Sequence, residues 1–290
     1  MEEKIQQIEF NNKRKNSEFD FINLKDLFSR KDISHSLYDF QRINFYMLLF
    51  FTNGHGQHTI DFTDYTYCKG TVLSIRKDQI HKFFKTDGTG YLLLFTDDFL
   101  IQFFERSEVL KSLQLFNELI TSPKVQLNNN EFLEFSGLIE AIAQEYLSFK
   151  DDHSMSIIRS LLHILFRKML RIKSKNHQVL SDKKYLREFI QFQQLVEHQC
   201  FQTKKVADYG KQLGVSTKTL NNITNHIVHK SAKNFINEIV ITQIKRLLVN
   251  TNLSIKEIAF SSGFEDSSNL FKFFKKYTQQ TPEGFRLSHQ

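Results

Sequence analysis

The 290-residue sequence has no tryptophan, two prolines and two cysteines. Cys68 and Cys200 stand far apart and form no Cys-x-x-Cys pair, which argues against a disulfide framework and against a zinc site. No apolar run reaches the ~18 residues that a membrane-spanning helix needs. The N-terminal residues lack the basic and then apolar pattern of a signal peptide, so we expect a cytoplasmic protein without a membrane partner.

The composition is that of a globular protein rather than a disordered one, with 40% hydrophobic and 24% charged residues. The net charge of +7 is unevenly distributed. The part from Lys183 onward has 16 Lys and Arg against 8 Asp and Glu, whereas the rest has 23 against 24. This asymmetry favours a C-terminal domain that binds a polyanion, although a solvated basic face without a partner is the alternative.

Residues 1–100 contain short apolar segments separated by turns rich in glycine and asparagine. The segment 43–51 is strongly apolar and rich in aromatic residues, as in a buried strand. Shorter strands are predicted at 57–62, 71–75 and 91–95. Several short strands at this spacing predict a β-barrel or a β-sandwich.

The pattern changes to helical spacing after residue 98, and helices are predicted at 99–119, 130–149 and 154–172. The last of them has an apolar stripe wide enough to contact a partner helix, although packing within its own domain is the alternative. A polar, basic stretch that follows suggests a linker. The predicted organisation is a domain at 1–172 (barrel about 1–100, helices about 101–172), a linker at 173–183 and a domain at 184–290.

The C-terminal part is predicted to be helical throughout. Tight turns at Gly214 and Gly263 each join two short helices, which is the sequence form of a helix-turn-helix unit. Ser254 and Glu257 form a capping box, and Pro282 suits the first turn of a final helix. The predicted helices cover residues 184–200, 203–214, 216–226, 232–250, 254–262 and 266–277, and the last begins near 282.

The second helix of such a unit lies in the major groove of DNA, where Asn suits adenine and Lys suits guanine or phosphate. The helix at 232–250 would be roughly 28 Å long, enough to hold two such helices about one DNA turn apart. A helical bundle that binds no DNA is the alternative. The candidate DNA-binding residues are Lys218, Asn221, Asn222 and Asn225 in the first unit and Ser267, Ser268, Asn269, Lys272, Lys275 and Lys276 in the second.

The segment from about 204 to 286 resembles the DNA-binding domain of AraC/XylS-type transcription regulators. The resemblance is carried by IKEIA at 255–259, SGF at 262–264, NLFKFFKK at 269–276 and TPEGFR at 281–286. It implies base contacts from Lys218, Asn221 and Asn222 in the first unit and from Ser267, Ser268 and Lys272 in the second.

The first unit departs from the family pattern at three positions. Gly210 stands where the family usually has Ala, and Thr224 stands where a Phe is usual. Asn222 replaces a common basic residue on the exposed face. These departures are compatible with the fold, but they affect how strongly the first recognition helix is expected to contact DNA.

The N-terminal part more loosely resembles the cupin-like effector-binding and dimerisation domain of the same family, at residues 54–56, 70–73, 78–81 and 94–99. The candidate effector-binding residues are Phe45, Tyr46, Phe62 and His81. A metal-dependent cupin enzyme is a weaker alternative, because His55 and His58 flank a turn and no His-x-His-x-Glu cluster is present. The same aromatic residues could equally form a solid core. The protein would then be a regulator that binds no ligand and is controlled by partner contact.

The prediction is therefore an α+β protein. Its N-terminal part is a cupin-like β-barrel with a helical dimerisation segment, and its C-terminal part is an all-α double helix-turn-helix domain. We expect a non-enzymatic homodimer that needs no metal or cofactor. The resemblance implies double-stranded DNA, a small-molecule effector and RNA polymerase as its partners.

Overall fold

The computed structural model describes residues 5–10, 18–29, 36–101, 114–117, 122–148, 151, 153–176 and 185–289. The chain forms two compact units. The N-terminal unit contains residues 6–180, and the C-terminal unit contains residues 181–290 together with residues 1–5. Much of the helix predicted at 99–119 and part of the linker predicted at 173–183 lie outside the described residues. The predicted domain boundaries stay a prediction.

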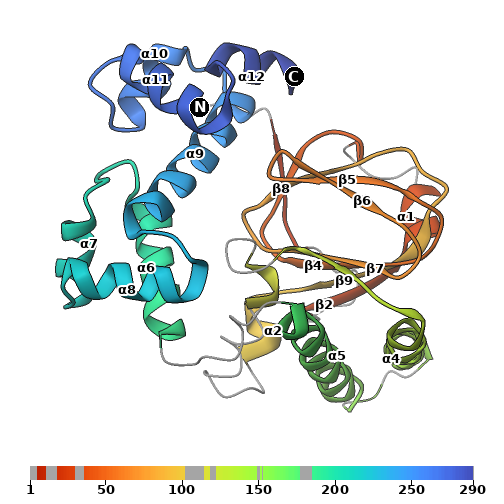
Figure 1. Cartoon of the computed structure of the whole chain (residues 1–290). Coiled ribbons are helices and arrows are strands. Elements are labelled where there is room, and N and C mark those ends of the chain that lie inside the picture. The colour runs from red at the N-terminus through yellow and green to blue at the C-terminus, as the bar shows by residue number, and fades with distance from the viewer. Residues whose placement is uncertain are drawn as a thin grey trace. The chain divides into compact units, whose positions relative to one another are not determined.

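The N-terminal unit contains two five-stranded sheets, which lie one above the other in Figure 1. The neighbouring strands are antiparallel except for the parallel pair β1 and β3. In sheet order, the first sheet contains β1 (Gln6–Ile8), β3 (Gln41–Ile43), β8 (Ile80–Phe83), β5 (Gly56–Ile60) and β6 (Thr63–Tyr67). The second contains β10 (Lys124–Gln126), β7 (Thr71–Ile75), β4 (Tyr46–Asn53), β9 (Thr89–Phe95) and β2 (Phe19–Asn23).

Strand β4 explains why the predicted strand at 43–51 is apolar at successive positions from Tyr46 to Phe51. Met47, Leu49 and Phe51 belong to the core between the two sheets. Leu48 and Phe50 belong to a second core on the other side of the same sheet. Because successive side chains of a strand point to opposite faces, a strand that is covered on both faces needs apolar residues at every position.

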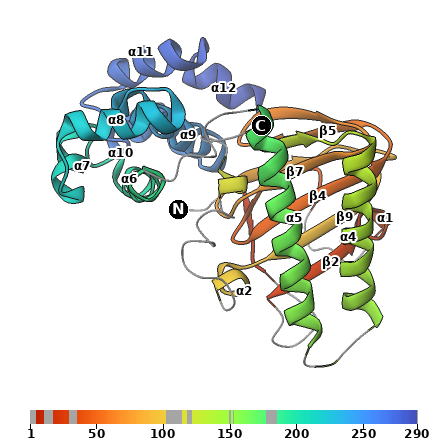
Figure 2. The same cartoon turned by 60° about the horizontal axis from the view of Figure 1, so that its bottom comes forward.

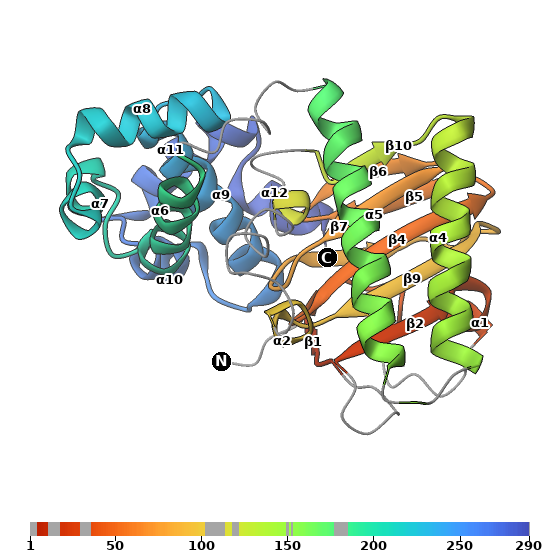
Figure 3. The same ribbon diagram turned by 90° about the horizontal axis from the view of Figure 1, so that it is seen from below.

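Among the described residues, the helices of the N-terminal unit are α1 (Leu24–Ser29), α2 (Asp97–Ile101), the 3₁₀ turn η1 (Gln114–Phe116), α4 (Asn129–Ser148) and α5 (Ser154–Asn176). Helices α4 and α5 lie side by side (Figure 2). They cross the face of the second sheet (Figure 3). Helix α5 continues past the predicted end at 172 to Asn176. Lys173 in its last turn is buried, and its ammonium donates hydrogen bonds to the carbonyls of Leu115 and Ser122.

The C-terminal unit is helical throughout, as predicted. Its helices are α6 (Leu186–Gln199), α7 (Val206–Leu213), α8 (Thr217–Val228), α9 (Ala232–Asn250), α10 (Ile255–Ser261), α11 (Ser267–Thr278) and α12 (Pro282–Ser288). Five of them begin where a side-chain oxygen accepts a backbone N–H three residues further on, which satisfies a donor that the helix leaves open. These capping residues are Ser216, Ser231, Ser254, Asp266 and Thr281.

Helix α9 is the central element of the C-terminal unit. Buried residues surround it on all sides, which is typical of a helix enclosed by others. The confirmed fold class is α+β, with an N-terminal sheet domain and a C-terminal helical domain. Within the described ranges, no helix combines the length and apolar character that a bilayer crossing requires.

Candidate nucleic-acid interface

The second helix-turn-helix unit consists of α10, a tight turn and α11. The turn residue Gly263 has φ +71°, in the left-handed region that glycine tolerates best. A Cβ atom at this position would also lie 2.2 Å from the carbonyl oxygen of Phe201. Leu270 and Phe274 of α11 are fully buried and fix the helix to its unit. The opposite side of α11 is thereby held towards solvent.

The six candidate residues of this unit all lie on α11. Ser267 is half-buried, and the other five are exposed. Asn269 donates a side-chain hydrogen bond of 3.3 Å to the carboxylate of the capping residue Asp266. In the described part of the chain, the ammonium groups of Lys272 and Lys275 have no partner and are available for an anion.

The first unit consists of α7, a turn and α8. Gly214 ends α7 with φ 66°, and its N–H bonds to the carbonyls of Gly210 and Lys211. Leu220, Ile223 and Thr224 form part of the buried side of α8. The unit therefore presents the other side of α8 to solvent in the same way as α11.

The four candidate residues of α8 differ in their surroundings. Lys218, Asn222 and Asn225 are exposed, whereas Asn221 is half-buried. The side-chain amide of Asn221 donates to the carbonyl of Thr217 at 2.9 Å, and its oxygen accepts the N–H of Ala232 at 3.0 Å. Asn221 therefore links α8 to the start of α9, a role that the sequence analysis did not foresee.

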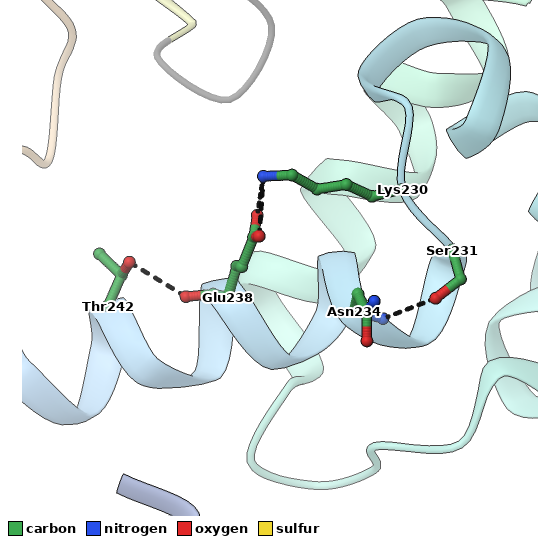
Figure 4. A network of polar contacts seen from close by, with 5 residues as sticks. All are labelled: Lys230, Ser231, Asn234, Glu238 and Thr242. Atoms are coloured by element: carbon green, nitrogen blue, oxygen red, sulfur yellow. Dashed lines mark hydrogen bonds and ion pairs between the residues drawn. The ribbon is translucent and has the colours of Figure 1, made fainter. Parts of the chain in front are cut away.

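Helix α9 carries both units, and its first turns are held by polar contacts (Figure 4). The Ser231 hydroxyl accepts the N–H of Asn234, and the Lys230 ammonium pairs with the Glu238 carboxylate at 2.7 Å. The Thr242 hydroxyl donates to the Glu238 carbonyl. The helix has 19 residues, so it is roughly 28 Å long at ~1.5 Å per residue.

The second unit is attached to the same helix by two side chains. The Asn237 amide of α9 donates to the Tyr277 hydroxyl of α11 at 2.6 Å. Arg286 of α12 donates from Nε to the carbonyl of Leu248 at 2.9 Å and from Nη2 to that of Leu253 at 2.6 Å. Arg286 belongs to the motif that carried the resemblance, but only the structure shows that it holds the end of α9.

The four candidate effector residues do not come together. Phe45 belongs to the core between the sheets, and His81 of β8 lies on the same inner side as Phe83. Tyr46 lies on the opposite face of its sheet, where its ring packs on Phe116. Phe62 is half-buried in the turn between β5 and β6, at φ 64°. The outward position of Tyr46 places it outside any space between the sheets.

A residue that the sequence analysis set aside, His58 of β5, lies beside His81. The two rings are stacked with centroids 5.3 Å apart. His58 is 0% exposed, and neither ring nitrogen has a hydrogen-bond partner among the described residues. Burial, and secondly the neighbouring His81, lower the pKa of His58 well below its ordinary value. The ring is therefore neutral at pH 7.

The described residues contain no group of three or more His, Cys, Asp or Glu that could hold a metal ion.

Residues 209–288 match the family model of a helix-turn-helix domain. The matched range begins within α7 and includes both units and α12. The C-terminal unit contains an AraC-type helix-turn-helix domain. This confirms the resemblance that the motifs at 255–286 indicated.

Among curated proteins, the chain is similar to an HTH-type transcriptional regulator of uncharacterised role from Staphylococcus aureus. The two are 24% identical over 255 residues, which are 87% of this chain and 33% of that protein. The Msm operon regulatory protein of Streptococcus mutans is 33% identical over 100 residues, 34% of this chain and 36% of that protein. The chain thus spans about a third of the length of the curated relatives it matches.

The chain is also similar to two solved structures. ToxT from Vibrio cholerae, solved with an unsaturated fatty acid bound, is 15% identical, with a TM-score of 0.41 over 86% of this chain and 89% of that chain. The C-terminal domain of the two-component response regulator yesN from Fusobacterium nucleatum is 24% identical, with a TM-score of 0.33 over 34% of this chain and 98% of that chain.

In this AraC-type domain, two departures of the first unit have a structural basis. A Cβ atom at Gly210 would lie 2.8 Å from the carbonyl oxygen of Val215, so the turn leaves no room for an alanine unless the backbone shifts. Thr224 is fully buried, and its hydroxyl donates to the carbonyl of Asn221. The departures therefore adjust the packing of α8 and do not remove its exposed face.

Proposed function

We propose that the protein is a transcription regulator that binds double-stranded DNA in a sequence-specific manner through α8 and α11. The observation that supports this most strongly is the AraC-type domain with two helices whose polar and cationic sides face solvent. Both helices are attached to α9. The surplus of 16 basic over 8 acidic residues in this part of the chain adds attraction to the phosphate backbone.

The two helices contribute different chemistry to this interface. Helix α11 presents Lys272, Lys275 and Lys276, which suit guanine and phosphate oxygens. Helix α8 presents Asn222 and Asn225, which suit adenine. Base specificity in the half of the DNA site that α8 contacts then depends on amide side chains. Attraction to the half that α11 contacts depends on the charge of its lysines.

The test is a selection of bound sequences from random duplex DNA with the full-length chain at ~0.15 M salt, since salt sets the phosphate contribution. Two short motifs about one helical turn apart are the expected result. Lys211→Ala serves as a control for Lys272→Ala, because Lys211 is an exposed lysine of α7 outside the proposed interface. Equal recovery of all sequences, with binding that falls steeply as salt rises, would contradict sequence-specific regulation.

We further propose that a small molecule held between the two sheets of the N-terminal unit controls DNA binding. The supporting observation is His58, a buried polar ring without a hydrogen-bond partner among the described residues, stacked on the candidate residue His81. An unsatisfied buried polar group is unfavourable unless something else compensates it. A ligand changes DNA affinity only if it binds the two states of the protein differently.

This second proposal is tested by thermal unfolding of the full-length chain against a panel of small metabolites. A compound that stabilises the protein should lose its effect in His58→Gln and keep it in His55→Gln, because His55 is exposed. Full DNA binding without any compound, unchanged by the whole panel, would favour the alternative of a regulator controlled by partner contact.

We also propose that the protein forms a homodimer and recruits RNA polymerase. Helices α4 and α5 expose four large apolar side chains, at Leu133, Leu147, Ile157 and Ile164. Their burial in a homodimer would remove apolar surface from water. Light scattering on the full-length chain and on Ile164→Lys tests the dimer, and transcription in vitro with purified RNA polymerase tests recruitment.

A further inference from the structure

Lys204 lies just before α7, the first helix of the first helix-turn-helix unit, but its side chain contacts the second unit. Its ammonium donates to the carbonyl of Ser262 at 2.6 Å and to that of Gly263 at 3.2 Å. The same nitrogen lies 4.4 Å from the centroid of the Phe264 ring, within the range of a cation–π contact. All three contacts are to the turn between α10 and α11.

The backbone of this turn also closely approaches the segment between α6 and α7, which contains Lys204 and leads into the first unit. A Cβ atom at Gly263 would lie 2.2 Å from the carbonyl oxygen of Phe201, so the two chain segments touch where glycine has no side chain. The preceding residue, Ser262, is fully buried. The Lys204 contacts therefore reinforce an interface between the two units rather than a chance crossing of exposed side chains.

The segment that carries Lys204 is itself fixed. The Tyr209 hydroxyl of α7 donates to the carbonyl of Thr203 at 2.8 Å. The Lys233 ammonium of α9 donates to the carbonyl of Lys204, also at 2.8 Å. Because these bonds tie the segment to both α7 and α9, it moves with the first unit.

The turn that Lys204 contacts leads directly into α11. Phe264 packs on Phe273 of α11 with ring centroids 5.3 Å apart, and Phe273 packs in turn on Tyr277 at 4.9 Å. A displacement of the turn would therefore displace α11. Lys204 thus connects the position of α11 to the unit that contains α8.

We propose that Lys204 is a positioning residue that fixes the separation of α8 and α11 and thereby sets the spacing of the two motifs that the protein accepts on DNA. The proposal rests on the proposed function, in which both helices read DNA. Without the Lys204 contacts, α9 would hold the two units with greater freedom of rotation and distance. Selectivity for one spacing would then fall.

The first experiment measures affinities for duplexes that carry the two selected motifs at their selected spacing or with one base pair inserted between them. In Lys204→Met, the ratio of the two affinities should fall about tenfold, which corresponds to about 1.4 kcal/mol. The control is Lys205→Met, which removes the same charge from the adjacent exposed residue and should keep the wild-type ratio. An equal loss of affinity at both spacings in Lys204→Met would overturn the proposal, because it would assign Lys204 to a phosphate.

A second measurement needs no DNA and separates this inference from the proposed function. Spin labels at Lys211→Cys in α7 and Lys256→Cys in α10, in a full-length chain with Cys68→Ser, report the distance between the units. The distance distribution should broaden in Lys204→Met and stay narrow in Lys204→Arg, since a guanidinium can bond two carbonyls and lie over a ring. If Lys204→Met does not fold, Lys204→Gln is the substitute, because it also removes the ammonium that makes both hydrogen bonds. An unchanged distribution in the folded variant would overturn the inference even where DNA binding is specific.

Discussion

Replacement of Arg286 by alanine is expected to destabilise the C-terminal unit by about 2–4 kcal/mol. Hydrogen bonds to charged groups contribute about 1.5–3 kcal/mol each, and Arg286 makes two with the carbonyls of Leu248 and Leu253. Because the side chain is half-buried, water screens and partly replaces these bonds, which reduces the sum of about 3–6 kcal/mol to about 2–4 kcal/mol. For a unit of about 110 residues, 1 kcal/mol corresponds to about 4 °C, so the expected loss in Tm is roughly 8–16 °C.

The two carbonyls lie at the end of α9 and just before the capping residue of α10. Local unfolding of this region should therefore increase before the whole unit unfolds. Hydrogen–deuterium exchange of the full-length chain measures this directly. Exchange should accelerate at the end of α9 and in α12 in Arg286→Ala, and less in Arg286→Lys, which keeps the charge but has a single nitrogen. Arg187→Ala is the matched control, because Arg187 is an exposed arginine of α6. Its effect should stay within about 0.5 kcal/mol.

The reasoning would be refuted by a particular combination of results. If Arg286→Ala exchanged like the wild type and yet bound DNA weakly, with a smaller salt dependence, Arg286 would be a phosphate contact. Its position in the family motif would then reflect DNA binding rather than the attachment of α12 to α9. A stability loss in Arg187→Ala as large as that in Arg286→Ala would also refute it, because general charge effects would then explain both.

Three further outcomes are expected. Lys272→Ala should weaken binding by about 1–3 kcal/mol and relax preference at one position of the motif in DNA titrations at fixed salt. Asn221→Ala should lower thermal stability, because it leaves the N–H of Ala232 unpaired, whereas Asn222→Ala should change the selected motif and leave stability unchanged. The pKa of His58 is lowered in the folded state, so the unfolded chain takes up the proton first. Stability of the N-terminal unit to denaturant should therefore fall as pH drops below about 6.5, and less so in His58→Gln.

The helices of the C-terminal domain could be predicted closely because several local signals agree. The helix predicted at 232–250 coincides with α9, and the predicted capping box at Ser254 and Glu257 is present. The turns predicted at Gly214 and Gly263 both have positive φ. Each of these features depends on residues within one or two helical turns, so sequence alone contains the information.

The interior of the N-terminal unit was less predictable, because its contacts depend on strand register. In a run that is apolar at every position, alternation does not show which face is the inner one, and Phe45 and Tyr46 therefore both qualified as candidates. His58 and His81 meet because β5 pairs with β8, where Ile60 lies opposite His81 and His58 opposite Phe83. The two strands are separated by β6 and β7, so no local pattern reveals the pairing.

The sequence also does not show which basic residues of the C-terminal unit are available to bind DNA. Formal charge counts each of them equally, but Arg246 is only 4% exposed, and Lys204 and Arg286 are bound to backbone carbonyls. These three cations are therefore buried or engaged in contacts within the domain. The salt dependence of DNA binding reports the number of phosphates neutralised, not the net charge of the protein. The exposed lysines of α8 and α11, rather than the total surplus of positive charge, should therefore determine how strongly binding responds to salt.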